Sequence, residues 1–191
     1  MLTRSLLPSE RELYRAHLLR LPAEDRFTRF CCTVSDESVN KYVDAIDFAK
    51  DHIKVSFDQH LNVIAAAHLC ALDDDTVEFS LSIEPPFRHK GYGRELFRNS
   101  IAWMKAVGIK RAYCSCLRTN GPMLHIAVTE GMDVCFDESQ VEAYLPLDKA
   151  GMGEIITEVI EEQIAWLDFT AKYLLTPNNI KYIREKYKLA G

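Results

Sequence analysis

Residues 76–107 are the stretch that decides how the rest of the chain folds. Residues 76–83 read Thr-Val-Glu-Phe-Ser-Leu-Ser-Ile, and Glu84-Pro85-Pro86-Phe87 and Arg88-His89-Lys90-Gly91-Tyr92-Gly93 follow them. β-Branched and aromatic residues that stop at prolines predict a strand over 76–83. Apolar residues at steps of three and four, with Gly108 after them, predict an amphipathic helix that ends near residue 107.

The turn between the predicted strand and helix has the features of an anion-binding site. It combines two glycines with three basic residues, Arg88, His89 and Lys90. The first N–H groups of a helix lack intrahelical acceptors, and the helix dipole favours a negative charge beside them. A glycine adds no side chain that would keep a phosphate away from the backbone. We therefore expect a site for a diphosphate-sized anion at this turn.

Two of the three phosphate-binding patterns that could fit the turn do not match. A P-loop needs Lys-Ser/Thr after its second glycine, whereas Arg94-Glu95 follow here. The dinucleotide fingerprint needs a small residue at Leu96 and an acidic residue after the next strand, where Cys114-Ser115-Cys116 stand. The third pattern remains. Arg88-x-x-Gly91-x-Gly93 resembles the acyl-CoA-binding signature of the GNAT superfamily of N-acyltransferases.

Composition limits the alternatives. The chain has 191 residues, 48% of them apolar, which suits one domain with a sizeable core. A net charge of -5 argues against a general nucleic-acid binder. No apolar run approaches the roughly 20 residues of a membrane span, and the N-terminal segment is too short for a secretion signal. Six cysteines without a Cys-x-x-Cys pair are expected to be reduced core residues of a cytoplasmic protein without a metal site.

The remaining patterns predict helices and strands on both sides of this stretch. The segment holding Arg26 and Arg29-Phe30 is interpreted as a charged loop, with a substrate or partner surface as the alternative. The expected order is a short strand within 2–7, a helix over 9–21 opened by a capping box at Ser9, a helix over about 35–48, a hairpin of strands 52–57 and 61–72, a strand over 111–117, a helix between Asn120 and Gly131, and strands 134–136 and 141–147. This order predicts an α/β fold, with a mixed, mostly antiparallel sheet and helices on both faces.

The same order resembles the GNAT fold over residues 1–148. A second matching segment is Asn120-Gly-Pro-Met-Leu-His-Ile-Ala-Val-Thr-Glu-Gly-Met132, which has the asparagine, helix and glycine that GNAT domains commonly carry. The chain is most similar to the acetyltransferase domain of bacterial protein-lysine acetyltransferases, through Arg29-Phe30, Glu78-Phe79 and Asn120-Gly-Pro-Met123. The acceptor does not follow from this resemblance, because small free-standing GNAT proteins share these features.

The resemblance implies transfer of an acetyl group from acetyl-CoA to an amine, on a small molecule or a protein lysine. Strands 76–83 and 111–117 would splay to admit the pantetheine arm, which backbone groups near Ile83 would bind. The diphosphate would lie on the turn, and Asn120 would be both a helix cap and a possible ligand of the cofactor arm. The expected cofactor-binding residues are therefore Ile83, Arg88, His89, Lys90, Gly91, Tyr92, Gly93, Arg94 and Asn120.

The catalytic groups are expected to differ from the common GNAT pattern. Positions that hold a carboxylate or histidine in several GNAT enzymes are Val77 and Phe79 here. The resemblance places the general base at Glu78, although strand alternation turns it to the other face. Glu84 is the second choice, but it is interpreted first as a solvated loop residue before Pro85. Ala127 stands where many relatives carry an acidic tyrosine. The thiolate would leave unassisted, or with help from Tyr92, Ser100 or His125.

Residues 149–191 lie outside the GNAT resemblance and are expected to form a C-terminal helical extension packed on the domain. The predicted helices cover 154–175 and 179–188, and the first has a wide apolar face. A homodimer contact or a lid over the acceptor site is the alternative. The two function hypotheses are an active acetyltransferase, and a GNAT-fold protein that binds acyl-CoA as a sensor or interaction partner. Neither nucleic acid nor a membrane is an expected partner.

Overall fold

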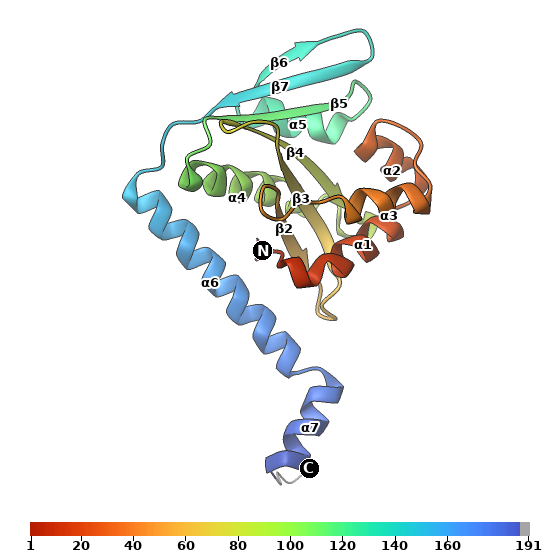
Figure 1. Ribbon diagram of the computed structural model, residues 1–191, viewed down its shortest axis with the longest axis vertical. Coiled ribbons are helices and arrows are strands. Elements are labelled where there is room, and N and C mark those ends of the chain that lie inside the picture. Colours follow the sequence, from red (N-terminus) through yellow and green to blue (C-terminus); the bar gives the residue numbers. More distant parts are fainter. Residues whose placement is uncertain (188–191) are drawn as a thin grey trace.

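A single seven-stranded sheet forms the centre of the computed structural model, which describes residues 1–187. The strands lie in the order β1-β2-β3-β4-β5-β7-β6 (Figure 1). Only β4 and β5 are parallel, and every other neighbouring pair is antiparallel. The strands are β1 Arg4–Ser5, β2 His52–Phe57, β3 Val63–Ala71, β4 Thr76–Ile83, β5 Arg111–Leu117, β6 Asp133–Phe136 and β7 Gln140–Pro146.

Helices cover both faces of the sheet, and each face has its own core. One core packs α1 (Arg11–Arg20) and α3 (Asp36–Asp44) against β2 and β3. The other packs α4 (Tyr92–Val107) and α5 (Gly121–Thr129) against β3, β4, β5 and β7. The short helix α2 (Ala23–Phe30) lies beside β4 and β5 on the α1 side. The predicted α/β class, the mixed sheet and the helices on both faces are confirmed.

The N-terminal third departs from the prediction in three places. Residues interpreted as a charged loop form α2, because Pro22 ends α1 with extended backbone and a new helix starts directly after it. The capping box at Ser9 is wrong. Residues Pro8–Glu10 form a 3-10 turn, and the Glu10 carboxylate accepts from the Leu7 backbone N–H at 3.0 Å. Helix α3 also ends at Asp44, four residues before the predicted end at 48.

The predicted splay between the two central strands is present. Strand β4 pairs with β5 only over Thr76, Val77 and Glu78, which face Arg111, Ala112 and Tyr113. Beyond Glu78 the two strands separate, while β4 keeps its pairing with β3 and β5 keeps its pairing with β7. In the described part of the chain, residues 79–83 of β4 therefore present a backbone edge with no strand partner on the β5 side. An unpaired edge of this kind can bind an extended chain by hydrogen bonds.

Helix α6 (Met152–Leu174) follows the last strand and packs on α4 and β1, and α7 (Pro177–Tyr187) continues beyond it (Figure 1). Two ion pairs hold α6 to β2. Lys54 is 3% exposed and lies 2.9 Å from Glu158 and 2.6 Å from Glu162. The Arg4 guanidinium lies over the Trp166 and Phe169 rings, at 4.0 and 3.9 Å from their centroids. Residue 188, where the second predicted helix ended, lies outside the described residues.

Removal of the Lys54 charge should therefore destabilise the protein far more than removal of a surface charge. We expect Lys54→Met to lower the free energy of unfolding by about 3 kcal/mol, because two partly buried carboxylates lose their cation. Lys41→Met is the matched control. Lys41 pairs with Glu37 on the surface, where both side chains are more than 70% exposed, so its loss should cost less than about 0.5 kcal/mol. Urea denaturation measures both, and equal losses would contradict the docking role of Lys54.

The cysteines are less uniform than predicted. Cys114 and Cys116 are buried, Cys31 and Cys70 are half-buried, and Cys32 and Cys135 are exposed. The expectation that all six are core residues is therefore wrong. Cys32 lies in the loop after α2 and Cys135 lies in the edge strand β6, and both positions leave the thiol near solvent. All six are free thiols. Within residues 1–187, no helix is long and apolar enough to span a bilayer, and no group of three or more His, Cys, Asp or Glu residues could hold a metal ion.

Candidate active site

The N-terminus of α4 provides a set of backbone N–H groups without acceptors. Gly91 is the N-cap residue and has φ of 89°, and His89 has φ of 57°. The first helical bond runs from the Glu95 N–H to the Gly91 carbonyl at 3.1 Å. Among the residues that the structure describes, no acceptor binds the N–H groups of residues 89–94. These donors and the helix dipole make the turn suited to an anion.

Gly93 brings this turn close to the end of β4 and to α5. A Cβ atom at Gly93 would lie 3.1 Å from the Ile126 Cδ1 and 3.3 Å from the Ile83 Cδ1. A side chain here would push the first turn of α4 away from both residues. At Gly91 the main reason for glycine is the left-handed backbone conformation, which other residues rarely adopt. Close packing therefore requires glycine at position 93, and backbone conformation requires it at position 91.

The basic side chains of the turn do not all face the free N–H groups. Arg88 pairs with Asp25 of α2, and its Nε donates to the Ile83 carbonyl at 3.3 Å. Arg94 lies 2.6 Å from Glu130, which also binds Arg98. His89 and Lys90 are exposed, and neither pairs with a carboxylate in the described part of the chain. In this conformation the two exposed side chains are the ones available to an incoming anion.

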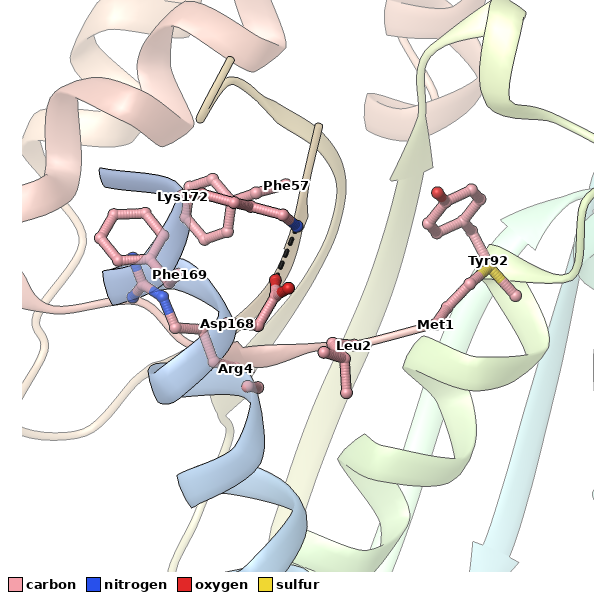
Figure 2. Close-up of a pocket in the computed structure, with 9 residues that line it drawn as sticks. Met1, Leu2, Arg4, Phe57, Tyr92, Asp168, Phe169 and Lys172 are labelled. Carbon is pink, nitrogen blue, oxygen red and sulfur yellow. Dashed lines mark ion pairs between the residues drawn. The ribbon is translucent and has the colours of Figure 1, made fainter. Parts of the chain in front are cut away.

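Asn120 and Tyr92 each stand at the start of a helix, Asn120 as the N-cap of α5 and Tyr92 as the first residue of α4. The Asn120 Oδ1 accepts from the Met123 N–H at 3.2 Å, so the residue caps α5 as predicted. The Tyr92 ring packs edge-on against Phe87, with 6.2 Å between the centroids. Tyr92 also lines a cavity of about 210 Å³, in which Met1, Leu2 and Arg4 lie between it and α6 (Figure 2). This cavity lies on the α6 side of the turn, away from the splayed strands.

Glu78 lies on the face of the sheet opposite α4. Strand β4 pairs with β3 without a register shift, so side chains alternate regularly along it. Val77 and Phe79 are buried in the core under α4. Glu78 therefore projects toward α2, on the same face as its strand neighbours Cys70 and Tyr113. The alternation predicted for Glu78 is confirmed, and no bulge brings it to the α4 side.

The surroundings of Glu78 make it a better base than an ordinary surface carboxylate. The side chain is half-buried, and this burial raises the pKa of the Glu78 carboxyl, while the charge of Arg29 lowers it in part. The structure gives it no hydrogen bond or ion pair among residues 1–187. Higher basicity and a lone pair not used within the protein suit proton abstraction.

Arg29 belongs to a polar network beneath α2 that the sequence did not reveal. Its guanidinium donates to the Tyr42 hydroxyl at 2.8 Å, and that hydroxyl lies 2.5 Å from the His68 Nδ1. His68 in turn lies 3.6 Å from Asp51. The described residues supply no carboxylate partner for Arg29. The Arg29-Phe30 pair was the available signal, but its partners come from α3 and β3.

Comparison with known proteins identifies the family of this fold and site. The model of the acetyltransferase (GNAT) family matches residues 18–127, which is more than half of the chain. The chain belongs to the GNAT family. The matched segment includes α2, the splayed strands, the Gly91 turn and Asn120. No curated protein sequence gives a significant match.

Solved GNAT structures share the fold at low sequence identity. The GNAT domain of S. lividans PAT has a TM-score of 0.65 at 16% identity, covering 76% of this chain and 89% of that one. Spermidine N-acetyltransferase from Vibrio cholerae, solved with CoA and spermine, has a TM-score of 0.61 at 16% identity, covering 77% and 95%. The ribosomal-protein-S18-alanine N-acetyltransferase of Escherichia coli has a TM-score of 0.58 at 14% identity, covering 78% and 96%.

Glu84, the alternative base, and Ser100, a candidate acid, are both less available for proton transfer than Glu78. The Glu84 carboxylate lies 2.8 Å from Arg20 and 3.2 Å from His17, and so it is already used within the protein. The interpretation of Glu84 as a solvated loop residue is therefore wrong. Ser100 is fully buried in the helix α4 core, and its hydroxyl has no hydrogen-bond partner among the described residues.

Three more positions bear on the identity of the general acid. Ala127 is buried in the core between α5 and the sheet, so no ionisable group occupies the position where many GNAT enzymes have tyrosine. His125 is exposed on α5. Tyr92, which is half-buried at the start of α4, is the candidate acid nearest to the free N–H groups.

The GNAT sheet carries a polar patch next to Glu78 on the α2 side. The Tyr113 and Tyr144 hydroxyls both donate to Glu142, at 3.0 and 2.9 Å. Their rings lie 4.9 Å apart, and strand pairing places both residues on the face that also carries Glu78. Burial, followed by the Glu142 hydrogen bond, raises the pKa of Tyr113 to about 12, so that its hydroxyl stays protonated. No cationic side chain in the described part of the chain pairs with Glu142.

Proposed function

We propose that this protein is an N-acetyltransferase that moves an acetyl group from acetyl-CoA to an amine by direct attack. One observation carries the proposal: the free N–H groups at Gly91 lie at the end of the same strand whose edge is left unpaired by the splay from β5. A diphosphate joined to an extended arm needs this combination. Membership of the GNAT family and the shared fold support acyl transfer in general.

The residues at the turn fit a CoA diphosphate. The N–H groups of residues 89–94 are unsatisfied donors, and Gly91 and Gly93 leave the backbone accessible. In the proposal, His89 and Lys90 add positive charge, and the backbone of β4 as far as Ile83 binds the pantetheine amides. Arg88 contributes by holding α2 through Asp25, because its guanidinium is already engaged there.

Acetyl-CoA, when bound, supplies an acyl group that is activated as a thioester. The chain supplies position and proton transfer. An ammonium has no lone pair, so the acceptor must lose a proton before it attacks. Glu78 is the proposed base, directly or through a water, because it is half-buried and has no hydrogen-bond or ion-pair partner among the described residues. The thiolate is proposed to leave unassisted, because the Tyr92 ring lines the cavity on the α6 side of the turn.

The acceptor is proposed to approach on the α2 side of the sheet. Glu78 faces that side, whereas α4 and α5 cover the other. Tyr113, Tyr144 and Glu142 form an aromatic and anionic patch beside it, which suits a positively charged amine. A small polyamine or a lysine side chain fits this chemistry. A screen of amines with acetyl-CoA, followed by release of free thiol, tests the proposal, and no release with any amine would overturn it.

The second candidate function is an acyl-CoA sensor or interaction protein. The buried Ala127 favours it, because this chain lacks the tyrosine found at that position in many GNAT enzymes. Both candidates require CoA binding, and only the enzyme releases thiol when an amine is added. Calorimetry with CoA and the thiol assay therefore separate them.

Loss of the Arg29 charge should move the acidic limb of the pH profile to higher pH. Burial already holds the pKa of Glu78 above its ordinary value, and Arg29 offsets part of that rise. A base works only when deprotonated, so activity falls as the pH drops through this pKa. In Arg29→Gln the pKa of Glu78 rises further, and the fall in kcat/KM begins at a higher pH.

The control for this prediction lies three residues earlier on the same helix. Arg26 pairs with Asp36, away from Glu78, so Arg26→Gln should leave the acidic limb where it is. A purely structural effect of losing an arginine from α2 would change the two variants alike. A limb that does not move in Arg29→Gln would show that another group titrates.

A further inference from the structure

The face of the sheet that carries Glu78 continues across β5 to β7. Strand pairing places Tyr113 beside Glu78 and Tyr144 beside Tyr113, so these three side chains form one row on that face. Glu142 lies two residues before Tyr144 on β7, and residues two apart on a strand share a face. Strand β7 lies on the far side of β5 from β4 (Figure 1). The proposed base and a second carboxylate therefore belong to one surface.

Glu142 is a half-buried carboxylate whose hydrogen-bond partners are neutral. Its Oε1 accepts from the Tyr113 hydroxyl at 3.0 Å, and its Oε2 accepts from the Tyr144 hydroxyl at 2.9 Å. Among residues 1–187 it forms no ion pair. Glu130 and Glu162 are also half-buried, and each of them binds an arginine or a lysine. The charge of Glu142 is therefore available to a cation from outside the chain.

The two tyrosine rings beside Glu142 make the site selective for an ammonium group. Their centroids lie 4.9 Å apart, and the rings are tilted by 38°. The face of an aromatic ring attracts a cation, so an ammonium between ring and carboxylate gains two favourable contacts. Arg111 is exposed on the same face, but it lies two residues before Tyr113, whereas Glu142 lies opposite Ser115, two residues after it. Arg111 is therefore at the other end of this surface from Glu142.

The two ends of the surface favour different protonation states of an amine. At the Glu78 end the charge of Arg29 lowers the pKa of the carboxyl in part. A nearby positive charge also favours the loss of a proton from an amine, which the reacting nitrogen requires. At the other end Glu142 favours an amine that keeps its proton. A linear molecule with an amine at each end satisfies both conditions.

The separation of the two carboxylates sets the length of such a molecule. Glu142 is two strands and two residues away from Glu78. Strands lie about 4.8 Å apart and residues rise by about 3.3 Å, so the two Cα atoms are separated by about 12 Å. Because both side chains are glutamates on one face, their carboxylates are separated by a distance on the order of 10 Å. This span fits a linear triamine such as spermidine better than a short diamine.

We propose that Glu142 and the Tyr113–Tyr144 pair bind a second ammonium group of the acceptor, so that the preferred acceptor is a linear polyamine. The inference rests on the proposed function, because it requires that the first amine reacts beside Glu78. Glu142 is then a specificity residue, which contacts the acceptor far from the reacting nitrogen. A monoamine lacks the charge that this carboxylate binds, and a protein lysine has its main chain in place of the second amine.

A comparison of spermidine with aminooctanol tests the second ammonium, because the two acceptors have similar lengths and differ in charge at the far end. Thiol release with acetyl-CoA gives kcat/KM for each. We expect the wild type to favour spermidine by about tenfold or more, the effect of one hydrogen bond to a charged group. Glu142→Gln keeps the shape of the side chain and removes its charge, so this ratio should fall to near one. The wild-type ratio should also fall as salt is added, because the site is partly exposed.

Glu138→Gln is the matched control. Glu138 is exposed in the turn between β6 and β7, so this variant changes the net charge by the same amount at another place. It should keep the wild-type ratio. A ratio that both variants lower alike would show a general attraction to an acidic protein and would overturn the role of Glu142. Equal rates for spermidine and aminooctanol in the wild type, or faster turnover of a lysine peptide than of spermidine, would overturn it as well.

Calorimetry separates a failure of this inference from a failure of the proposed function. Spermidine is titrated into the wild type and into Glu142→Gln, each loaded with CoA. Weaker binding to the variant, together with no thiol release from any amine, would overturn the enzyme and support the ammonium site. Thiol release with equal spermidine affinity in the two proteins would support the enzyme and overturn the site at Glu142.

Discussion

Gly91→Glu is expected to weaken CoA binding by roughly 100-fold or more, which corresponds to about 2.8 kcal/mol. Two effects combine at this position. The backbone has φ of 89°, where a side chain is strained, and a Cβ there would lie 3.0 Å from the Met1 methyl carbon. The new carboxylate would also stand among the free N–H groups and repel a diphosphate. Isothermal titration calorimetry with CoA measures the loss.

Gly108→Glu is the control that separates strain from the loss of the site. Gly108 ends the same helix with φ of 88°, and a Cβ there would meet no atom within 4 Å. The backbone strain is therefore similar, about 1–3 kcal/mol in stability for each variant. Only the variant at the start of α4 should lose affinity. If both bind CoA equally well, the diphosphate does not lie on the Gly91 turn.

Glu78→Gln is expected to lower kcat by about 100-fold to 10,000-fold, the range contributed by a positioned general base. The CoA affinity should stay within about twofold of the wild type, because Glu78 faces α2, away from the α4 turn. The amide has nearly the same shape as the carboxylate, so packing against the half-buried site is kept. Steady-state thiol release at saturating acetyl-CoA gives kcat, and calorimetry gives the affinity.

Glu84→Gln provides the comparison for this result. Its carboxylate is also half-buried near the end of β4, but it is bound by Arg20 and His17. We expect this variant to lose stability and to keep a kcat close to that of the wild type. A wild-type rate in Glu78→Gln would show that the acceptor loses its proton to another group.

Local sequence patterns predicted the secondary structure correctly where neighbouring residues along the chain determine it. The strand over 76–83, the helix up to residue 107 and the Asn120 cap were all predicted within a residue or two. Helix α2 was missed because it has eight residues and starts directly after Pro22, so its periodicity is short. The splay of β4 from β5 was implied by the resemblance alone, since no local pattern encodes where two strands stop pairing.

Side-chain partners were the least predictable part of the site. Arg88 follows the strand in the expected motif, but its guanidinium binds Asp25, which lies 63 residues earlier. Glu84 was interpreted as solvated, but Arg20 and His17 reach it from α1. Arg29 was assigned to a loop, but its guanidinium donates hydrogen bonds to the hydroxyls of Tyr42 in α3 and Tyr14 in α1. Each of these contacts joins segments that are far apart in sequence, and nothing in the sequence indicates that they lie close together in space.

The sequence by itself determined that a strand, a glycine turn and an amphipathic helix occur between residues 76 and 107, and that their order matches one family. Steric limits at Gly91 and the pattern of apolar residues act over a few positions, and so a short stretch contains them. Only the tertiary structure decided that Glu78 faces α2 with no ion-pair partner in residues 1–187, that Arg88 is already paired, and that one side of α6 is exposed. These properties depend on which distant elements pack together, because burial and charge pairing arise only when the whole sheet and its helices are assembled.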